Sequence, residues 1–308
     1  SGHRGIVDYQ PAELVLTARA GTPLEELRDV LATEGQMLPF EPPVLSGSAT
    51  LGGTLACNLS GPGRPWYGSI RDAVLGVQLV NGKAELLNFG GQVMKNVAGY
   101  DVSRLQAGAM GTLGVICQVS LKVLPQSERI VTLAYELNAA RALEVMNSRA
   151  GEARPLTGAC WQDGMLYLRL AGAAEAVQRT VSDWGGQQLP QQSQPWEQLR
   201  EFASPFFRGD DPLWRLSLAS TAPLDTAADD TLLDWGGAQR WLRGAADFGL
   251  LQEAAADAGG HACLFRGGDR SGEVRQALDP LQQQLQGRLK QAFDPRSIFN
   301  PGRLYGWL

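Results

Sequence analysis

Hydrophobic and polar residues alternate along one segment of the first half of the chain, with the apolar positions Val115, Cys117, Val119, Leu121 and Val123. A period of two puts these side chains on one face, so the segment predicts a β-strand with one buried face. Residues 13–20 predict another strand. Residues 73–80 and 83–89 predict a hairpin, because an Asn81-Gly82 turn lies between them.

The segment after residue 20 has the period of a helix instead. Its leucines recur at intervals of three and four, which predicts an amphipathic helix with a stripe of Leu24, Leu27 and Leu31. Thr22 and Glu25 have the spacing of a capping box, and Gly35 is a typical stop signal.

Strand and helix patterns alternate after Pro125. Strands are predicted at 130–137, 156–161, 165–170, 213–218 and 261–265, and helices at 139–148, 173–184 and 246–258. This order predicts an α+β domain, an antiparallel sheet with helices on one face. A last helical pattern covers 274–293, with Asp279-Pro280 dividing it, and leads the chain back to the first domain. We therefore expect three parts: 1–127, 128–270 and 271–308.

Glycine is concentrated between residues 46 and 114, and it adjoins the alternating strand directly. Glycine tolerates positive φ and lets bare backbone approach a ligand, so the region predicts a loop-built site whose amides hold a flat cofactor. The same glycines would also serve tight turns between short strands, and composition alone does not separate the two interpretations.

Charge and residue counts exclude several classes of function. The 308 residues have a formal charge of −5, which argues against a nucleic-acid partner. The 4 cysteines form no CxxC pair, so we expect buried free thiols and no metal site. With 2 histidines and no phosphate-binding glycine loop, zinc-protease and P-loop chemistry are absent. No apolar run is long enough to span a membrane, and we expect a cytoplasmic protein.

Two segments carry a resemblance to a known family: ATLGGTLACNLSGPGRPWYGSIRDAVLG and VMKNVAGYDVSRLQAGAMGTLGVICQVSLKVLP. They resemble the second FAD-binding subdomain of the vanillyl-alcohol-oxidase-type (PCMH-type) flavoproteins. Together with the terminal FNPGRLYG, they are most similar to the FAD-binding E subunits of bacterial glycolate oxidases. The resemblance implies a PCMH-type FAD-binding domain followed by an α+β cap domain with an antiparallel sheet.

The resemblance also implies a cofactor and the residues that bind it. Non-covalent FAD is expected to contact Thr50, Leu51, Gly52, Gly53, Asn58, Ser60, Gly61, Gly111, Gly114, Val115 and Asn300. The family's first FAD subdomain is expected ahead of HRGIVDY and is not in this sequence, and a chain without it is expected to hold FAD less tightly.

The function that the resemblance implies is oxidation of glycolate or a related small 2-hydroxy acid. The implied partners are a homologous catalytic flavoprotein subunit and an iron–sulfur subunit, with at most peripheral attachment to the inner face of the cell membrane. Two alternatives stay open: a non-catalytic assembly subunit, and a stand-alone D-2-hydroxy-acid dehydrogenase. No catalytic base is assigned. His261 is interpreted as a hydrogen-bonded structural residue, and Arg64, Arg71, Arg104, Arg215 and Arg266 are unassigned candidates for a carboxylate.

Overall fold

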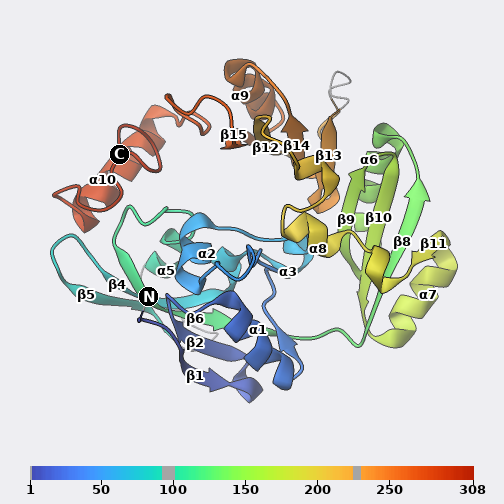
Figure 1. Ribbon diagram of the computed structural model, residues 1–308, viewed down its shortest axis with the longest axis horizontal. Helices are drawn as coiled ribbons and strands as arrows, with labels where there is room; N and C mark the ends of the chain where they lie inside the picture. Colours follow the sequence, from blue (N-terminus) through green and yellow to red (C-terminus); the bar gives the residue numbers. More distant parts are fainter. Residues whose placement is uncertain (1, 92–100, 225–229) are drawn as a thin grey trace. The chain divides into compact units, whose positions relative to one another are not determined.

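A computed structural model of the chain describes residues 2–91, 101–224 and 230–308 (Figure 1). Residues 92–100 of the glycine-rich region lie outside this part. The chain divides into two compact units. Unit 1 comprises Ser1–Gly61, Gly68–Gln126 and Leu278–Leu308, and unit 2 comprises Pro62–Tyr67 and Ser127–Ala277. The division into three domains at 127 and 270 stays a prediction.

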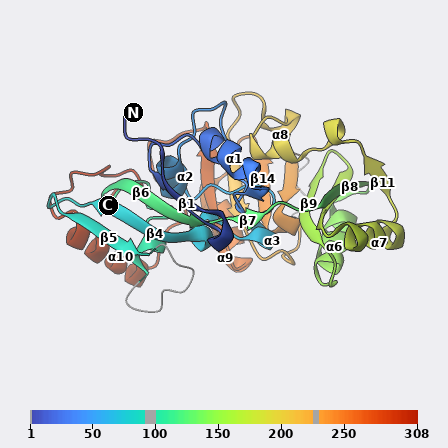
Figure 2. The same ribbon diagram turned by 90° about the horizontal axis from the view of Figure 1, so that it is seen from below.

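Unit 1 is built on a five-stranded antiparallel sheet with strand order β1-β2-β6-β4-β5 (Figure 2). The alternating segment forms the central strand β6 (Val115–Lys122), between β2 (Val15–Arg19) and β4 (Val74–Val80). The edge strands are β1 (Ile6–Gln10) and β5 (Leu86–Gly90). The strand and hairpin predictions are confirmed, whereas β1 was not predicted.

Helix α1 (Leu24–Thr33) confirms the leucine stripe, because Leu24, Leu27 and Leu31 are all fully buried. The predicted cap is wrong. The Thr22 hydroxyl donates to the carbonyl oxygen of Arg19 at 2.7 Å and accepts the N–H of Gly5 at 2.9 Å. It therefore fastens β1 to the end of β2, and the helix begins after Pro23 without a side-chain cap.

Shorter elements complete unit 1. Strands β3 (Gln36–Met37) and β7 (Leu124–Pro125) pair with each other, and the short helices are α2 (Leu51–Cys57), α4 (Ile70–Ala73) and α5 (Val102–Leu105). Leu51, Leu55 and Ile70 join the leucines of α1 in one core on the sheet.

The C-terminal helix α10 (Pro280–Phe293) belongs to unit 1. Asp279 caps it by accepting the N–H of Gln282 at 2.8 Å, so the helix starts at the predicted Asp-Pro pair and the predicted helix before this pair is wrong. The hairpin turn between β4 and β5 contacts the other end of α10. The N–H of Gly82 donates to the carbonyl oxygen of Phe293 at 2.8 Å.

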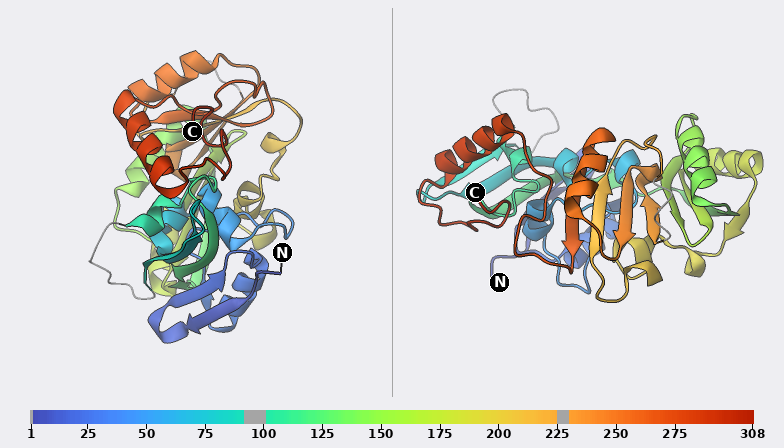
Figure 3. Two further views of the ribbon diagram at one scale, coloured as in Figure 1. Left: turned by 90° about the vertical axis from the view of Figure 1, so that its left-hand side faces the viewer. Right: turned by 90° about the horizontal axis from the view of Figure 1, so that it is seen from above.

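Unit 2 contains an eight-stranded antiparallel sheet with strand order β11-β8-β10-β9-β13-β14-β12-β15 (Figure 3). In chain order the strands are β8 (Arg129–Glu136), β9 (Leu156–Gln162), β10 (Met165–Gly172), β11 (Gln187–Leu189), β12 (Leu213–Ser217), β13 (Thr231–Asp234), β14 (Gln239–Arg243) and β15 (His261–Arg266). The α+β class and the antiparallel sheet are confirmed. Strands β11, β13 and β14, which have three to five residues, were not predicted.

Both faces of this sheet are covered. Helices α6 (Ala139–Ala150), α7 (Ala174–Trp184) and α9 (Phe248–Asp257) pack on one face through the leucines of β10 and through Trp214 and Leu264. The other face holds an aromatic cluster with α8 (Trp196–Arg200). In this cluster the ring of Trp241 lies 4.9 Å from that of Phe265. Helix α3 (Arg64–Tyr67) also belongs to unit 2.

The helices in the described ranges lack the combined length and hydrophobicity that crossing a membrane requires.

Candidate functional site

The first part of the expected cofactor loop, from Thr50 to Gly53, is the start of helix α2. Thr50 caps this helix, since its Oγ1 accepts the N–H of Gly53 at 3.3 Å. The N–H of Leu51 donates to the carbonyl oxygen of Thr22 at 3.0 Å, and the N–H of Gly52 donates to that of Ala20 at 2.8 Å. These amides are satisfied within the chain, and Leu51 is fully buried. The expectation of a loop that offers free amides here is wrong.

Gly52 and Gly53 have different structural roles. A Cβ atom on Gly52 would lie 2.6 Å from the Cβ of Ala20, so glycine is required here for α2 to approach β2. Gly53 is exposed, and a Cβ there would meet only the Thr50 hydroxyl, at 3.1 Å. Of the two, only Gly53 leaves space for a ligand.

Three other expected site glycines also lie against atoms of the chain itself. A Cβ on Gly61 would overlap the carbonyl oxygen of Glu41, and one on Gly114 would lie 2.5 Å from that of Val80. At Gly111, where φ is +70°, it would lie 2.9 Å from Nδ2 of Asn300. These glycines permit close packing of backbone segments, which is the tight-turn alternative that the sequence left open.

The end of α2 meets the turn at residues 106–113. The N–H of Gly108 donates to the carbonyl oxygen of Leu55 at 3.0 Å, and the N–H of Met110 donates to that of Ala56 at 2.9 Å. Asn58 ends the helix with φ +52°, a left-handed conformation that Asn tolerates better than most residues. Its Oδ1 is buried and has no hydrogen-bond partner in the described part of the chain.

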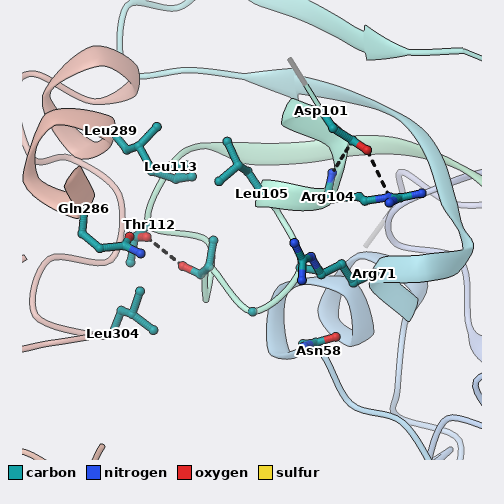
Figure 4. A pocket seen from close by; sticks show the side chains of 13 residues that line it. Asn58, Arg71, Asp101, Arg104, Leu105, Thr112, Leu113, Gln286, Leu289 and Leu304 are labelled. Atoms are coloured by element: carbon teal, nitrogen blue, oxygen red, sulfur yellow. Dashed lines mark hydrogen bonds and ion pairs between the residues drawn. The ribbon is translucent and has the colours of Figure 1, made fainter. Parts of the chain in front are cut away.

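A pocket of about 440 Å³ opens beside this junction in unit 1 (Figure 4). Its lining comes from α2, α4, α5, the 106–113 turn, α10 and the C-terminal segment: Asn58, Arg71, Asp101, Arg104, Leu105, Ala107, Gly108, Ala109, Thr112, Leu113, Gln286, Leu289 and Leu304. Leucines form one end together with Gln286 and Thr112, and the other end has Asn58, Arg71, Asp101 and Arg104.

The two arginines of the pocket differ in their partners. Arg104 is paired with Asp101, with 3.0 Å between Nε and Oδ2. Arg71 makes no hydrogen bond or ion pair to any described residue, and its side chain lies close to Asn58 in Figure 4. Arg71 thus brings to the polar end of the pocket a cation that has no counter-ion among the described residues, and Asn58 has a buried acceptor that no described donor reaches.

A buried ion pair holds the C-terminal segment against the 106–113 turn. Nζ of Lys290 donates to Oδ2 of Asp294 at 2.8 Å, to the carbonyl oxygen of Thr112 at 2.8 Å and to that of Phe299 at 2.7 Å. Both side chains of the pair are at least 93% buried. Nδ2 of Asn300 adds a hydrogen bond to the carbonyl oxygen of Met110 at 2.8 Å.

The expected site residues fall into separate groups in the structure. Asn58, Gly111 and Asn300 meet around the 106–113 turn. Thr50 to Gly53 lie at the other end of α2. Ser60 accepts the N–H of Ile70 at 3.4 Å, and Val115 is half exposed at the start of β6.

The pocket suits part of a flavin nucleotide. Such a group combines a flat, largely apolar ring with polar edges that donate and accept hydrogen bonds, and it carries anionic phosphates. The described residues supply leucines, the buried amide oxygen of Asn58 that lacks a donor among them, and the cation of Arg71 that lacks a counter-ion among them. These groups match that chemistry, so the donor set fits FAD.

A metal site is not supported by the described residues, which contain no group of three or more histidine, cysteine or acidic side chains suited to a metal ion. None of the 4 cysteines forms a disulfide bond. The expectation of buried thiols is confirmed for Cys160 and Cys263, whereas Cys57 is exposed and Cys117 is partly exposed.

Comparison with known proteins defines the class first. A family model described as "FAD binding domain" matches residues 1–90. The solved structure of an alkyldihydroxyacetonephosphate synthase has the same fold, with a TM-score of 0.65 at 16% identity over 97% of this chain and 66% of that one. Residues 1–90 thus match the FAD-binding-domain family, and the chain shares the fold of that synthase.

Relatives then identify the family. Glycolate oxidase subunit GlcE of Escherichia coli (strain K12) is 45% identical over 306 residues, which are 99% of this chain and 86% of that protein. Glycolate oxidase subunit GlcD of Bacillus subtilis (strain 168) is 31% identical over 49% of this chain and 33% of that protein. D-2-hydroxyglutarate dehydrogenase of Xanthomonas citri pv. viticola is 32% identical over 42% of this chain and 27% of that protein. The chain belongs to the GlcE family of glycolate oxidase subunits, within the FAD-dependent oxidoreductases.

The sequence analysis did not identify the residues that hold the pocket-lining segments together. Lys290 and Asp294 stand at a helical spacing of four, which is typical of ordinary surface pairs, and nothing in the pattern showed that they are buried. Arg71 was considered only as a carboxylate candidate, and its proximity to Asn58 depends on the tertiary fold.

The packing role of Gly52 predicts a stability effect. Gly52→Ala should destabilise the protein by about 1–3 kcal/mol, because the new methyl group overlaps Ala20. Gly53→Ala is the matched control and should destabilise far less, since the new methyl group replaces a helical glycine and would meet only the side-chain hydroxyl of Thr50. Urea unfolding monitored by circular dichroism measures both. Equal stability of the two variants would contradict the packing role.

The buried pair predicts an acid-sensitive contribution to stability. Burial opposes ionisation of Asp294, but hydrogen bonds from Lys290 and from the N–H groups of Phe299 and Ile298 outweigh it and lower the pKa of this carboxyl. The contribution should be complete above the unfolded pKa of about 4 and should be lost as the pH falls through the lower folded value.

Lys290→Met should cost about 3–5 kcal/mol at pH 7, because a buried carboxylate loses its cation. The double variant Lys290→Met with Asp294→Asn should recover part of this loss and should depend less on pH below 4. Thermal unfolding between pH 3 and 7 tests both statements. A single variant as stable as the wild type would refute the role of the pair.

Proposed function

We propose that this chain is the FAD-binding subunit of a glycolate oxidase complex, which oxidises glycolate to glyoxylate. The likeness to GlcE along 99% of the chain is the observation that carries the proposal. The likeness to a GlcD subunit over 49% of the chain supports a homologous flavoprotein as partner. An iron–sulfur subunit would take the electrons, since the widely spaced cysteines of this sequence contain no cluster motif.

The pocket of unit 1 is the proposed binding site for part of the cofactor. Bound FAD would supply the acceptor for a hydride from a 2-hydroxy acid. Oδ1 of Asn58 would accept a hydrogen bond from the cofactor, Arg71 would offset negative charge, and the leucines of α5 and α10 would exclude water. At the other end of α2, the missing side chain of Gly53 would let the cofactor approach the backbone.

A second candidate is a non-catalytic assembly subunit of the same complex. The observation that favours it is the packing of Gly52, Gly61, Gly111 and Gly114 against the chain's own atoms, because these glycines then have a structural reason without a cofactor. Either role is compatible with a cytoplasmic complex that touches the membrane only peripherally.

The visible spectrum separates the two candidates. The purified chain, supplemented with FAD and freed of excess by gel filtration, should show flavin absorbance between 350 and 450 nm, which is the usual flavin range. Anaerobic glycolate should bleach it, either in the isolated chain or only after the partner subunits are added. A colourless protein after reconstitution would reject the flavoprotein proposal, and flavin that glycolate never bleaches would favour the assembly role.

Asn58 provides a direct test of the pocket. Asn58→Gly keeps the left-handed backbone and removes the buried acceptor, so flavin content should fall at least about fivefold, as a lost hydrogen bond of about 1 kcal/mol predicts. The melting temperature of the apoprotein should not fall, because a buried polar atom without a partner is also removed. Unchanged flavin content in this variant would contradict the placement.

A further inference from the structure

Three basic side chains meet on the aromatic face of the unit 2 sheet, outside the pocket described above. Strand register pairs Arg215 of β12 with Cys263 of β15, and an isolated bridge pairs Cys263 with Arg275. Paired residues on neighbouring strands direct their side chains to the same face. His261 is two residues before Cys263 and therefore shares this face, opposite Ser217.

These three groups have no acceptor in the described parts of the chain. Arg215 lies over the ring of Phe265, with 5.4 Å between its Cζ and the ring centroid, and it makes no hydrogen bond or ion pair there. Nε of Arg275 is buried without a partner. The His261 ring makes no hydrogen bond either, so the expectation of a hydrogen-bonded structural histidine is wrong.

One acidic side chain on this face already has hydrogen-bond partners within the chain. Asp234 of β13 pairs with Gln239, Gln239 with Ser217, and Ser217 with His261, so the four side chains share a face. The carboxylate of Asp234 accepts the N–H of Trp235 at 2.8 Å and an amide N–H of Gln239 at 3.4 Å.

Positive charge accumulates around the histidine. Partial burial, and then the guanidinium groups of Arg215, Arg64 and Arg275, lower the pKa of His261. The imidazole is therefore neutral at pH 7 and able to donate or accept one hydrogen bond. Unpaired guanidinium groups on a partly buried face destabilise the empty protein, and a bound anion would relieve this cost.

We propose that Arg215, Arg275 and His261 form a binding site for a small 2-hydroxy or 2-oxo carboxylate. The planar guanidinium matches a carboxylate in charge and geometry, and the neutral imidazole suits the adjacent hydroxyl or carbonyl oxygen. Arg215 lies over the ring of Phe265, and this ring is 4.9 Å from that of Trp241, so aromatic side chains border the proposed site. The choice of a 2-hydroxy acid rests on the proposed function, whereas the anion site rests on the geometry alone.

Calorimetric titration of the full chain tests the site. The probes are glycolate, acetate, which lacks the hydroxyl, and sulfate at equal ionic strength. Arg215→Gln and Arg275→Gln should each weaken glycolate binding at least about tenfold, as loss of a charge-assisted hydrogen bond predicts. Arg179→Gln is the matched control, because Arg179 is exposed on α7 and should not matter. His261→Ala should remove the preference for glycolate over acetate.

Two results would overturn the proposal: no glycolate binding by the wild-type chain, or the same affinity in the wild type and the arginine variants. Equal binding of sulfate and glycolate would overturn the carboxylate assignment. Flavin absorbance recorded on the same samples keeps the tests separate. A colourless chain that still binds glycolate through Arg215 would contradict the proposed function and leave this site intact. Unchanged circular dichroism of the variants would show that lost binding is not lost folding.

Discussion

The buried pair of Lys290 and Asp294 is the constraint on which the described pocket depends. Two opposite charges inside a protein are stable only when their remaining hydrogen-bonding capacity is used, and here it is. The ammonium binds the carbonyl oxygens of Thr112 and Phe299, and the carboxylate binds the amides of Ile298 and Phe299. The pair therefore fixes the 106–113 turn, the end of α10 and the C-terminal segment together. Without it, three walls of the pocket would lose their common anchor.

The glycine distribution has two causes that only the structure separates. Gly52 and Gly61 allow one backbone to approach another, as the overlaps with Ala20 and Glu41 demonstrate. Gly53 has no such contact apart from the Thr50 hydroxyl. A glycine-rich segment can thus belong to a cofactor-binding family and still use most of its glycines for packing. The glycines alone therefore do not locate a ligand site in this segment.

Local patterns predicted much of the fold and little of the site. The leucine stripe of α1 and the alternation of β6 are encoded within a few residues, and both were predicted. The Asp279-Pro280 pair was recognised only as a break within a longer helix, whereas it is the start of α10. Helix α2 was missed because two glycines at its start have low helix propensity, which the Thr50 cap and the contact with β2 override. Site residues such as Arg71 and Arg275 become recognisable only when tertiary neighbours reveal which groups lack a partner.

The same reasoning connects the two proposed sites, although they lie in different units. Folding usually pairs a guanidinium group or leaves it in water, so an arginine held on a partly buried surface without an acceptor needs an explanation. Arg71 lines a pocket with Asn58, whose buried amide oxygen lacks a donor among the described residues, and with several leucines, which suits a large group of mixed polarity. Arg215 and Arg275 stand beside a neutral histidine and aromatic rings, which suits a small anion. An oxidoreductase that couples a bulky cofactor to a two-carbon acid needs both kinds of site, and this chain carries groups suited to each.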